Sequence, residues 1–178
     1  FFLGLLDHLA GRGCPVPATI HDRAGAALRW LSDSRAPEGP RKAVALIEFL
    51  PGISVGRPSP AQARSVGAAL AGAHLAAADY PAHRANDLGP ARSAAVMAAC
   101  GAAALGGIDP ALPPLIDTAA QVAAHWPAGL PASVIHSDLF PDNVLMRGDQ
   151  VTGLIDFYFA CNDAMAYDLA VTHAAWSF

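Results

Sequence analysis

Apolar residues recur at helical spacing from the first positions of the chain. Phe2, Leu5, Leu6 and Leu9 fall on one face of a helix, because their spacing matches a period of 3.6 residues. The glycines at positions 11 and 13 favour an end to that helix. The sequence therefore predicts an amphipathic helix as its first element.

A second helical pattern begins at a capping box. Ser59 lies three residues before Gln62, and Pro60 occupies the first helical position, which together are typical of a helix N-terminus. We predict a helix from Pro60 to about Ala78. We interpret His74 on its apolar face as an interior histidine with a hydrogen-bond partner rather than a ligand. That face comprises Val66, Leu70, His74 and Ala77.

Three further stretches have the composition and period of helices. They lie near residues 91–104, 112–125 and 164–176. We expect Asp109 to cap the second of them, whose first turn is rich in proline.

Strands are predicted between the first two helices. Residues 18–21 and 26–31 flank a polar, glycine-containing turn and predict a β-hairpin. Residues 32–41 hold two prolines and a glycine and predict a loop. The aliphatic run at 43–49 predicts a buried strand, which Pro51 and the glycine after it would stop.

A second hairpin is predicted near the end of the chain, after a short strand at 134–135. Residues 144–147 and 151–155 would pair across it. A two-residue turn at 149–150 would set Asp156 opposite Asn143, and a three-residue turn would shift this by one place. Opposed Cα atoms lie roughly 4.5–5.5 Å apart in antiparallel pairs. Either register places the Asn143 amide oxygen and the Asp156 carboxylate within reach of one or two cations.

Composition narrows the function classes. The 178 residues are 53% hydrophobic, enough to bury a sizeable core in one domain or one and a half. With a net charge of −4 and no basic run, we expect no nucleic-acid partner. The apolar start has no basic region like that of a signal peptide, and the alanine-rich stretch 94–105 is too short for a bilayer. We therefore expect a cytoplasmic protein with no membrane association.

Cysteine and histidine usage points away from metal binding and disulfides. Cys14, Cys100 and Cys161 are odd in number and widely spaced, which predicts buried thiols in a reducing compartment. The seven histidines do not have the spacing of zinc ligands.

Candidate chemistry gathers in the segment HSDLFPDN, which runs from His136 to Asn143. Asp138, Asn143 and, beyond the hairpin, Asp156 supply the oxygen donors that a magnesium-dependent phosphoryl transfer requires. Asp138 would orient a hydroxyl and accept its proton. The alternative reading is a turn-rich loop whose acids bind backbone amides, and Asp142 after its proline suits either reading.

The segments HSDLFPDN and LIDFYFA resemble the catalytic loop and the metal-binding segment of the aminoglycoside-phosphotransferase and choline-kinase group. The sequence outside these two segments most resembles the bacterial homoserine kinases of that group, and the resemblance covers nearly the whole chain. It is carried by FFLGLLDHLAGRGCPVP, IEFLPG, RANDLG from Arg84 to Gly89, and GLIDFYFACNDAMAYDLA.

This resemblance implies an α+β, protein-kinase-like fold of two lobes. Residues 1–50 would form a truncated small β lobe, and residues 51–178 a mainly helical large lobe that is incomplete at its end. In the family, a glycine-rich strand-turn-strand and a phosphate-binding lysine precede the first helix seen here. Lys42, the only lysine, lies too late to replace that lysine. We therefore expect the chain to be a fragment, inactive by itself.

The resemblance also assigns roles to residues at the reaction centre. Asp138 would be the catalytic proton acceptor, while Asn143 and Asp156 would hold Mg²⁺ against the phosphates of ATP. The implied reaction is phosphorylation of the side-chain hydroxyl of L-homoserine, for threonine synthesis.

Other residues would support that centre. The carbonyl of Glu48 and the amide of Leu50 would bind adenine at the hinge between the lobes, unless the strand simply ends there. His136 would pack beneath the metal-binding segment, and Asp168 would hold the backbone amides of the catalytic loop.

Two alternatives remain open. The first keeps the chemistry and changes the acceptor to choline, an aminoglycoside or another small alcohol. The acidic residue often found just after the metal-binding aspartate is replaced by Phe157-Tyr158-Phe159, which favours a small, compact substrate. The second alternative is a nucleotide-binding or interaction module without catalysis.

Overall fold

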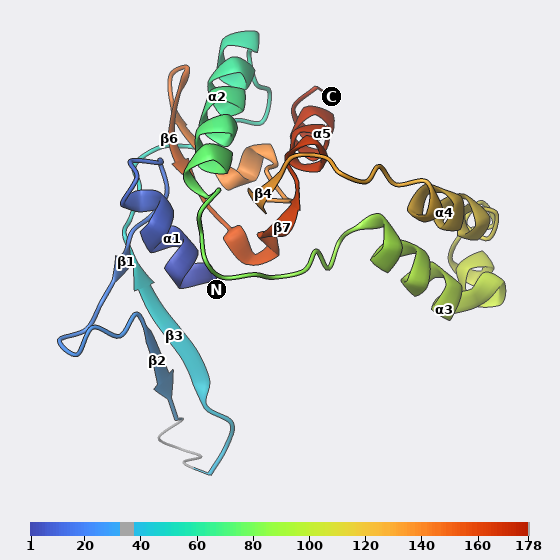
Figure 1. Ribbon diagram of the computed structural model, residues 1–178, viewed down its shortest axis with the longest axis horizontal. Helices are drawn as coiled ribbons and strands as arrows, with labels where there is room; N and C mark the ends of the chain where they lie inside the picture. The colour runs from blue at the N-terminus through green and yellow to red at the C-terminus, as the bar shows by residue number, and fades with distance from the viewer. Residues whose placement is uncertain (33–37, 178) are drawn as a thin grey trace.

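The computed structural model describes residues 1–32 and 38–177 and mixes helices with short sheets, as predicted (Figure 1). In chain order its elements are α1 (Phe2–Ala10), β1 (Thr19–Ile20), β2 (Leu28–Leu31), β3 (Lys42–Ile47), α2 (Pro60–Ala76), α3 (Pro90–Ile108), α4 (Leu115–Ala124), β4 (Ala132–Ile135), the 3-10 helix η1 (Pro141–Asn143), β5 (Val144–Arg147), β6 (Gln150–Leu154), the 3-10 helix η2 (Phe157–Phe159), β7 (Cys161–Ala164) and α5 (Met165–Trp176).

The first sheet differs from the predicted hairpin. β1 and β2 each pair antiparallel with β3, with Thr19 opposite Ile47 and Leu28 opposite Ala45. Asp22 closes the turn between β1 and β2 by accepting two backbone N–H bonds. The hairpin prediction was wrong because both strands find their partner further along the chain, which a local pattern does not reveal.

β3 was predicted to be buried, and this too was wrong. Its side chains are largely exposed, with 40% of Val44 and 65% of Leu46 open to solvent. The predicted loop at 32–41 falls mostly outside the described residues, since 33–37 are among those left out. The division into lobes at residue 50 stays a prediction.

α1 is confirmed as an amphipathic helix that packs on the core. Polar contacts fix it on two sides: Asp7 accepts the backbone N–H of Thr19 at 3.2 Å, and Arg12 donates to Asp79 at 2.8 Å, beyond the end of α2. Its buried residues are Leu5, Leu6 and Leu9.

α2 begins with the predicted capping box. The Ser59 hydroxyl accepts the N–H of Gln62 at 3.2 Å, and the Gln62 side-chain oxygen accepts the N–H of Ser59 at 2.8 Å. The predicted apolar face is the buried one, and it packs against α1, β4, β6 and α5. Its buried residues are Val66, Leu70, Ala73 and His74.

Two small antiparallel sheets carry the predicted chemical segments. β4 pairs with β7, with Ile135 opposite Cys161, a pairing that the sequence did not predict. β5 and β6 form the predicted hairpin, but its turn lies at residues 148–149, one place earlier than expected. A bulge then shifts the register so that Val144 faces Leu154.

α3 and α4 pack against each other and project from the rest of the chain (Figure 1). α3 is longer than the predicted 91–104, and Gly101 interrupts it with φ 74° and ψ 160°. α4 starts three residues later than predicted. Asp109 does not cap it, because its carboxylate accepts the nearby amide of Ala111 instead.

By length and composition alone, α3 is long and apolar enough to cross a membrane, contrary to the expectation from residues 94–105. Gly101, however, divides it into the helical stretches 90–100 and 102–108. Neither stretch reaches the roughly 20 residues that a helical span requires.

The prediction of buried thiols is right for Cys161 and wrong for Cys100, which is exposed, while Cys14 is half-buried. Burial raises the pKa of Cys161 to about 11. The Cys161 thiol is therefore protonated and unreactive at neutral pH.

Candidate active site

The loop between β4 and β5 brings Asp138 and Asn143 into direct contact. η1 turns the chain back, so that the Asn143 amide nitrogen donates to the Asp138 backbone oxygen at 2.8 Å and to its carboxylate at 3.2 Å. Because the amide nitrogen is directed at Asp138, the amide oxygen of Asn143 points away from it. That oxygen is the atom a cation would use.

Asp168 binds the backbone at the start of this loop. It is fully buried on α5, and its two carboxylate oxygens accept the N–H groups of His136 and Ser137, each at 2.8 Å. Ser137 has φ +69°, a left-handed conformation that costs about 1 kcal/mol or more for a residue with a side chain. The paired amide bonds hold the backbone in that conformation.

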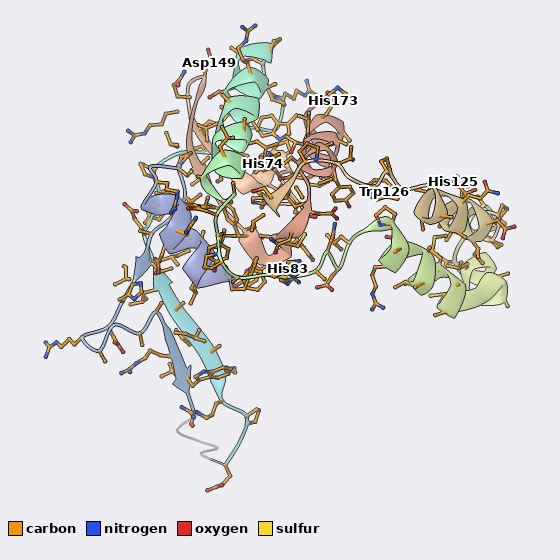
Figure 2. All side chains as sticks on the ribbon, viewed as in Figure 1. His74, His83, His125, Trp126, Asp149 and His173 are labelled. Carbon is orange, nitrogen blue, oxygen red and sulfur yellow. The ribbon has the colours of Figure 1, made fainter. Side chains whose placement is uncertain are left out.

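His74 completes the environment of Asp168. Its Nε2 lies 2.7 Å from the Asp168 carboxylate, and its backbone oxygen accepts the Ser133 hydroxyl at 2.8 Å (Figure 2). This is the interior, hydrogen-bonded histidine that the pattern of α2 predicted. A third contact comes from α5, where the Trp176 indole donates to the Leu139 backbone oxygen at 2.8 Å.

His136 links the loop to the segment that carries Asp156. Its Nε2 donates to the backbone oxygen of Ile155 at 2.9 Å, and its Nδ1 accepts the N–H of Asp138 at 3.3 Å. This pair of contacts requires a neutral ring. Burial lowers the pKa of His136, which keeps it neutral, and the ring packs on Phe157 with centroids 4.5 Å apart.

Asp156 does not lie directly opposite Asn143 but one residue further along the chain, a shift of one place from the register of a two-residue turn at 149–150. The N–H of Ile155 donates to the Asn143 backbone oxygen at 3.0 Å, so Ile155 is the residue that faces Asn143. Asp156 follows with φ +63° and begins η2. The left-handed conformation turns the chain at this point, and the Asp156 carboxylate is exposed and near enough for its charge to act on Asp138.

The charges of two neighbouring carboxylates act on Asp138. Partial burial raises the pKa of Asp138 above its ordinary value, and the charges of Asp156 and Asp142 act in the same direction. His136 and the amide of Asn143 oppose that rise. Among the described residues, no three His, Cys, Asp or Glu side chains lie close enough to hold a metal ion by themselves, so a cation here would also need ligands such as the Asn143 amide oxygen.

Asp156 also lines a cavity of about 410 Å³. One wall comes from Phe2, Leu3 and Leu6 of α1, and another from Ala43, Val44, Ala45 and Ile47 of β3. The cavity is therefore mostly apolar, with a carboxylate at one side. A flat aromatic group beside charged phosphates would suit this combination.

The predicted hinge residues lie at the end of β3. The N–H of Glu48 donates to the Ala18 backbone oxygen at 2.8 Å, which ties this point to β1. Leu50 contacts the hairpin, since a Cβ added to Gly153 would lie 2.9 Å from its Cδ1. Their roles toward adenine stay predictions, as do the catalytic, metal and supporting roles of the other site residues.

Sequence reasoning missed two features of the site. The left-handed conformations of Ser137 and Asp156 have no local signal such as glycine. Arg84 was noted only within a family-like stretch, yet it donates to the backbone oxygen of Ala160 at 3.0 Å.

The fold is protein-kinase-like, and solved phosphotransferases share it. A model of the phosphotransferase enzyme family, APH, matches residues 1–178. The chain therefore belongs to the APH phosphotransferase family.

Two curated relatives that match the whole chain are homoserine kinases. The homoserine kinase of Caulobacter sp. (strain K31) is 47% identical over 180 residues, and that of Xanthobacter autotrophicus (strain ATCC BAA-1158 / Py2) is 44% identical over 182. Both matches cover 100% of this chain and 53% of the relative. The chain thus spans about half the length of the curated relatives it matches.

Solved structures give the same fold. An aminoglycoside-3′-phosphotransferase of type VIII matches with a TM-score of 0.63 and 27% identity. The match covers 99% of this chain and 64% of the phosphotransferase chain. An amicoumacin kinase in complex with AMP-PNP and Ca²⁺ has a TM-score of 0.69 at 14% identity, covering 96% of this chain and 52% of its own. The latter likeness shows the fold alone.

Proposed function

We propose that this protein carries the catalytic centre of a kinase that transfers the γ-phosphoryl group of ATP to the side-chain hydroxyl of L-homoserine. The observation that carries the proposal is the contact between Asp138 and Asn143, with Asp156 beside them and a 410 Å³ cavity at its side. A proton acceptor and two oxygen ligands side by side are what phosphoryl transfer to an alcohol requires.

Each of these side chains has a separate task in the proposed reaction. Asp138 orients the acceptor hydroxyl and accepts its proton as the oxygen bonds to phosphorus. The Asn143 amide oxygen and the Asp156 carboxylate would hold magnesium, which supplies positive charge against the β- and γ-phosphates of ATP. Asp168 and His136 keep the loop backbone and the Asp156 segment in register.

The nucleotide would occupy the cavity between α1, β3 and Asp156. Its walls are mainly apolar, which suits adenine, and Glu48 and Leu50 at the end of β3 would offer backbone groups to the base. The complex of the amicoumacin kinase with AMP-PNP and Ca²⁺ supports a nucleotide with a divalent cation in this fold.

Homoserine is favoured as the acceptor by the relatives that cover the whole chain at 44–47% identity and are named homoserine kinases. The aromatic residues 157–159, which stand where an acidic residue often follows the metal-binding aspartate, agree with a small, compact acceptor. An ATP-dependent reaction on a free amino acid suits a cytoplasmic protein whose partner is a small molecule.

The test is an acceptor screen with the full-length protein. ADP release would be measured with L-homoserine, L-serine, choline and an aminoglycoside, each with and without Mg²⁺. We expect homoserine to give the highest kcat/KM. Preference for choline or the aminoglycoside would retain the chemistry and overturn the acceptor, and Mg·ATP binding without turnover on any acceptor would favour a non-catalytic nucleotide-binding module.

A further inference from the structure

Residues 80–89, which we call the strap, join α2 to α3 without forming helix or strand. The strap runs past the start of α1 and beneath β7, and His83 marks its course (Figures 1 and 2). Its first residue is anchored to α1, because the Tyr80 hydroxyl donates to the Phe1 backbone oxygen at 2.7 Å. The strap contains the RANDLG stretch, to which the proposed reaction assigns no task.

Arg84 binds the strap to the chain just after η2. Its backbone forms a reciprocal pair with Asn162: the Arg84 N–H donates to the Asn162 side-chain oxygen at 2.9 Å, and the Asn162 N–H donates to the Arg84 oxygen at 2.8 Å. Its guanidinium donates to the oxygen of Ala160, a fully buried residue, at 3.0 Å. A buried carbonyl that loses such a partner costs about 1–3 kcal/mol.

These contacts fix one end of the segment that begins at Asp156. The other end is fixed by the bonds of Ile155 to His136 and Asn143. Between the two anchors lies η2, entered through the left-handed Asp156. A segment with a strained residue keeps its conformation only when its surroundings hold it on both sides.

The remaining contacts of Arg84 leave it little freedom to act on a phosphate. Its second terminal nitrogen lies 2.5 Å from the Asp87 carboxylate, and the guanidinium stacks over the Phe2 ring of α1 at 5.2 Å. Two residues further along the strap, the Asn86 side-chain amide donates to the Asp163 carboxylate at 2.7 Å. Arg84 therefore joins α1 and the strap to Ala160 and to β7.

We propose that Arg84 is a positioning residue that sets the orientation of the Asp156 carboxylate through Ala160 and Asn162. This inference rests on the proposed function, in which Asp156 holds magnesium. Loss of the Arg84 side chain weakens Mg·ATP binding and leaves recognition of the acceptor unchanged, because its contacts lie on the segment after Asp156 and not on the Asp138 loop.

The test compares Arg84→Met, Arg84→Lys and the control Arg92→Met, which removes an exposed arginine of α3. Hydrogen exchange of amides 157–163 is measured without nucleotide, and Mg·ATP affinity and acceptor KM are measured separately. For Arg84→Met we expect exchange about 10-fold faster and Mg·ATP binding about 5-fold weaker, with acceptor KM unchanged. Arg84→Lys restores part of both effects, since an ammonium still reaches one acceptor.

Wild-type exchange or wild-type Mg·ATP affinity in Arg84→Met overturns the proposal, and so does an effect confined to acceptor KM. If Arg84→Met does not fold, Asn162→Ala removes the partner of the Arg84 N–H and is expected to give the same pattern. Failure of the wild-type protein to transfer phosphate would defeat the proposed function, while the exchange measurement would still decide whether Arg84 holds the segment.

Discussion

Ser137 donates its backbone N–H to Asp168 at 2.8 Å while its own φ is +69°, so a fully buried carboxylate stabilises a strained residue next to Asp138, the proposed proton acceptor. The same carboxylate accepts the N–H of His136 and contacts His74. Three neighbours thus depend on one side chain. The geometry of the catalytic loop is therefore set by α5, which follows it by about thirty residues in the sequence.

Asp168→Asn tests this dependence. The asparagine side chain keeps one oxygen that accepts a backbone N–H, but its NH₂ group replaces the other oxygen. One of the two buried backbone N–H groups therefore loses its partner. We expect a loss of about 2 kcal/mol in the free energy of unfolding and a marked fall in kcat. Chemical denaturation checks the first and steady-state kinetics the second. Asp117→Asn, on the exposed side of α4, is the control, and equal stability of the two variants would contradict the role of Asp168.

Sequence patterns predicted what is local in this fold. The capping box of α2, its buried face and the presence of the last hairpin all depend on residues within a few positions of one another. Pairings between distant segments were missed or misassigned, as for β4 with β7 and for β1 with β3. The predicted burial of β3 was wrong because an aliphatic run indicates a strand but does not show whether other elements cover it.

The site was predicted only in part, because some of its contacts are local in the sequence and others join distant segments. Spacing placed Asn143 and Asp156 near each other, but an earlier turn, partly offset by a bulge, sets Ile155 opposite Asn143 in place of Asp156. The contact of Arg84 with Ala160 joins residues 76 positions apart, and the composition of neither segment reveals it.

Asp138→Asn is expected to lower turnover at least about 100-fold while Mg·ATP still binds, because an amide does not accept the proton of the acceptor hydroxyl. The Asn143 contact to the Asp138 backbone oxygen does not involve the carboxylate, so the loop retains its shape. Single-turnover kinetics and calorimetric titration with Mg·ATP separate the two effects. Near-normal turnover would remove Asp138 from the mechanism.

Asp156→Asn is a sharper test of the metal site than Asp156→Ala. Asparagine tolerates the left-handed backbone at φ +63°, whereas alanine adds strain to the loss of the carboxylate. We expect Asp156→Asn to raise the Mg²⁺ concentration for half-maximal activity by about 10-fold or more with little change in stability. Asp156→Ala is expected to raise that Mg²⁺ concentration as well and also to lower the stability. Unchanged magnesium dependence in Asp156→Asn would contradict a role as a ligand.

Gly52→Ala is expected to destabilise the contact between the hinge region and the β5–β6 hairpin. Gly52 has φ +153°, and an added Cβ would lie 2.5 Å from the Thr152 hydroxyl oxygen and 3.0 Å from the backbone nitrogen of Met146. We expect a loss of about 1–3 kcal/mol in the free energy of unfolding, measured by thermal or chemical denaturation. Gly56→Ala is the matched control, since a Cβ there meets nothing within 4 Å, and equal effects would show that the close approach is unimportant.

Asp142→Asn is expected to move the acid limb of the pH–rate profile to lower pH. Burial raises the pKa of Asp138, and the Asp142 charge adds to that rise. Asp138 must be ionised to accept a proton, so kcat/KM falls as the pH drops through this raised pKa. Removing the Asp142 charge lowers the pKa of Asp138 and extends activity toward acid. The control is Asp149→Asn at the tip of the hairpin, away from the catalytic loop (Figure 2). A limb that stays in place in Asp142→Asn, or moves equally in both variants, would mean that the limb does not report ionisation of Asp138.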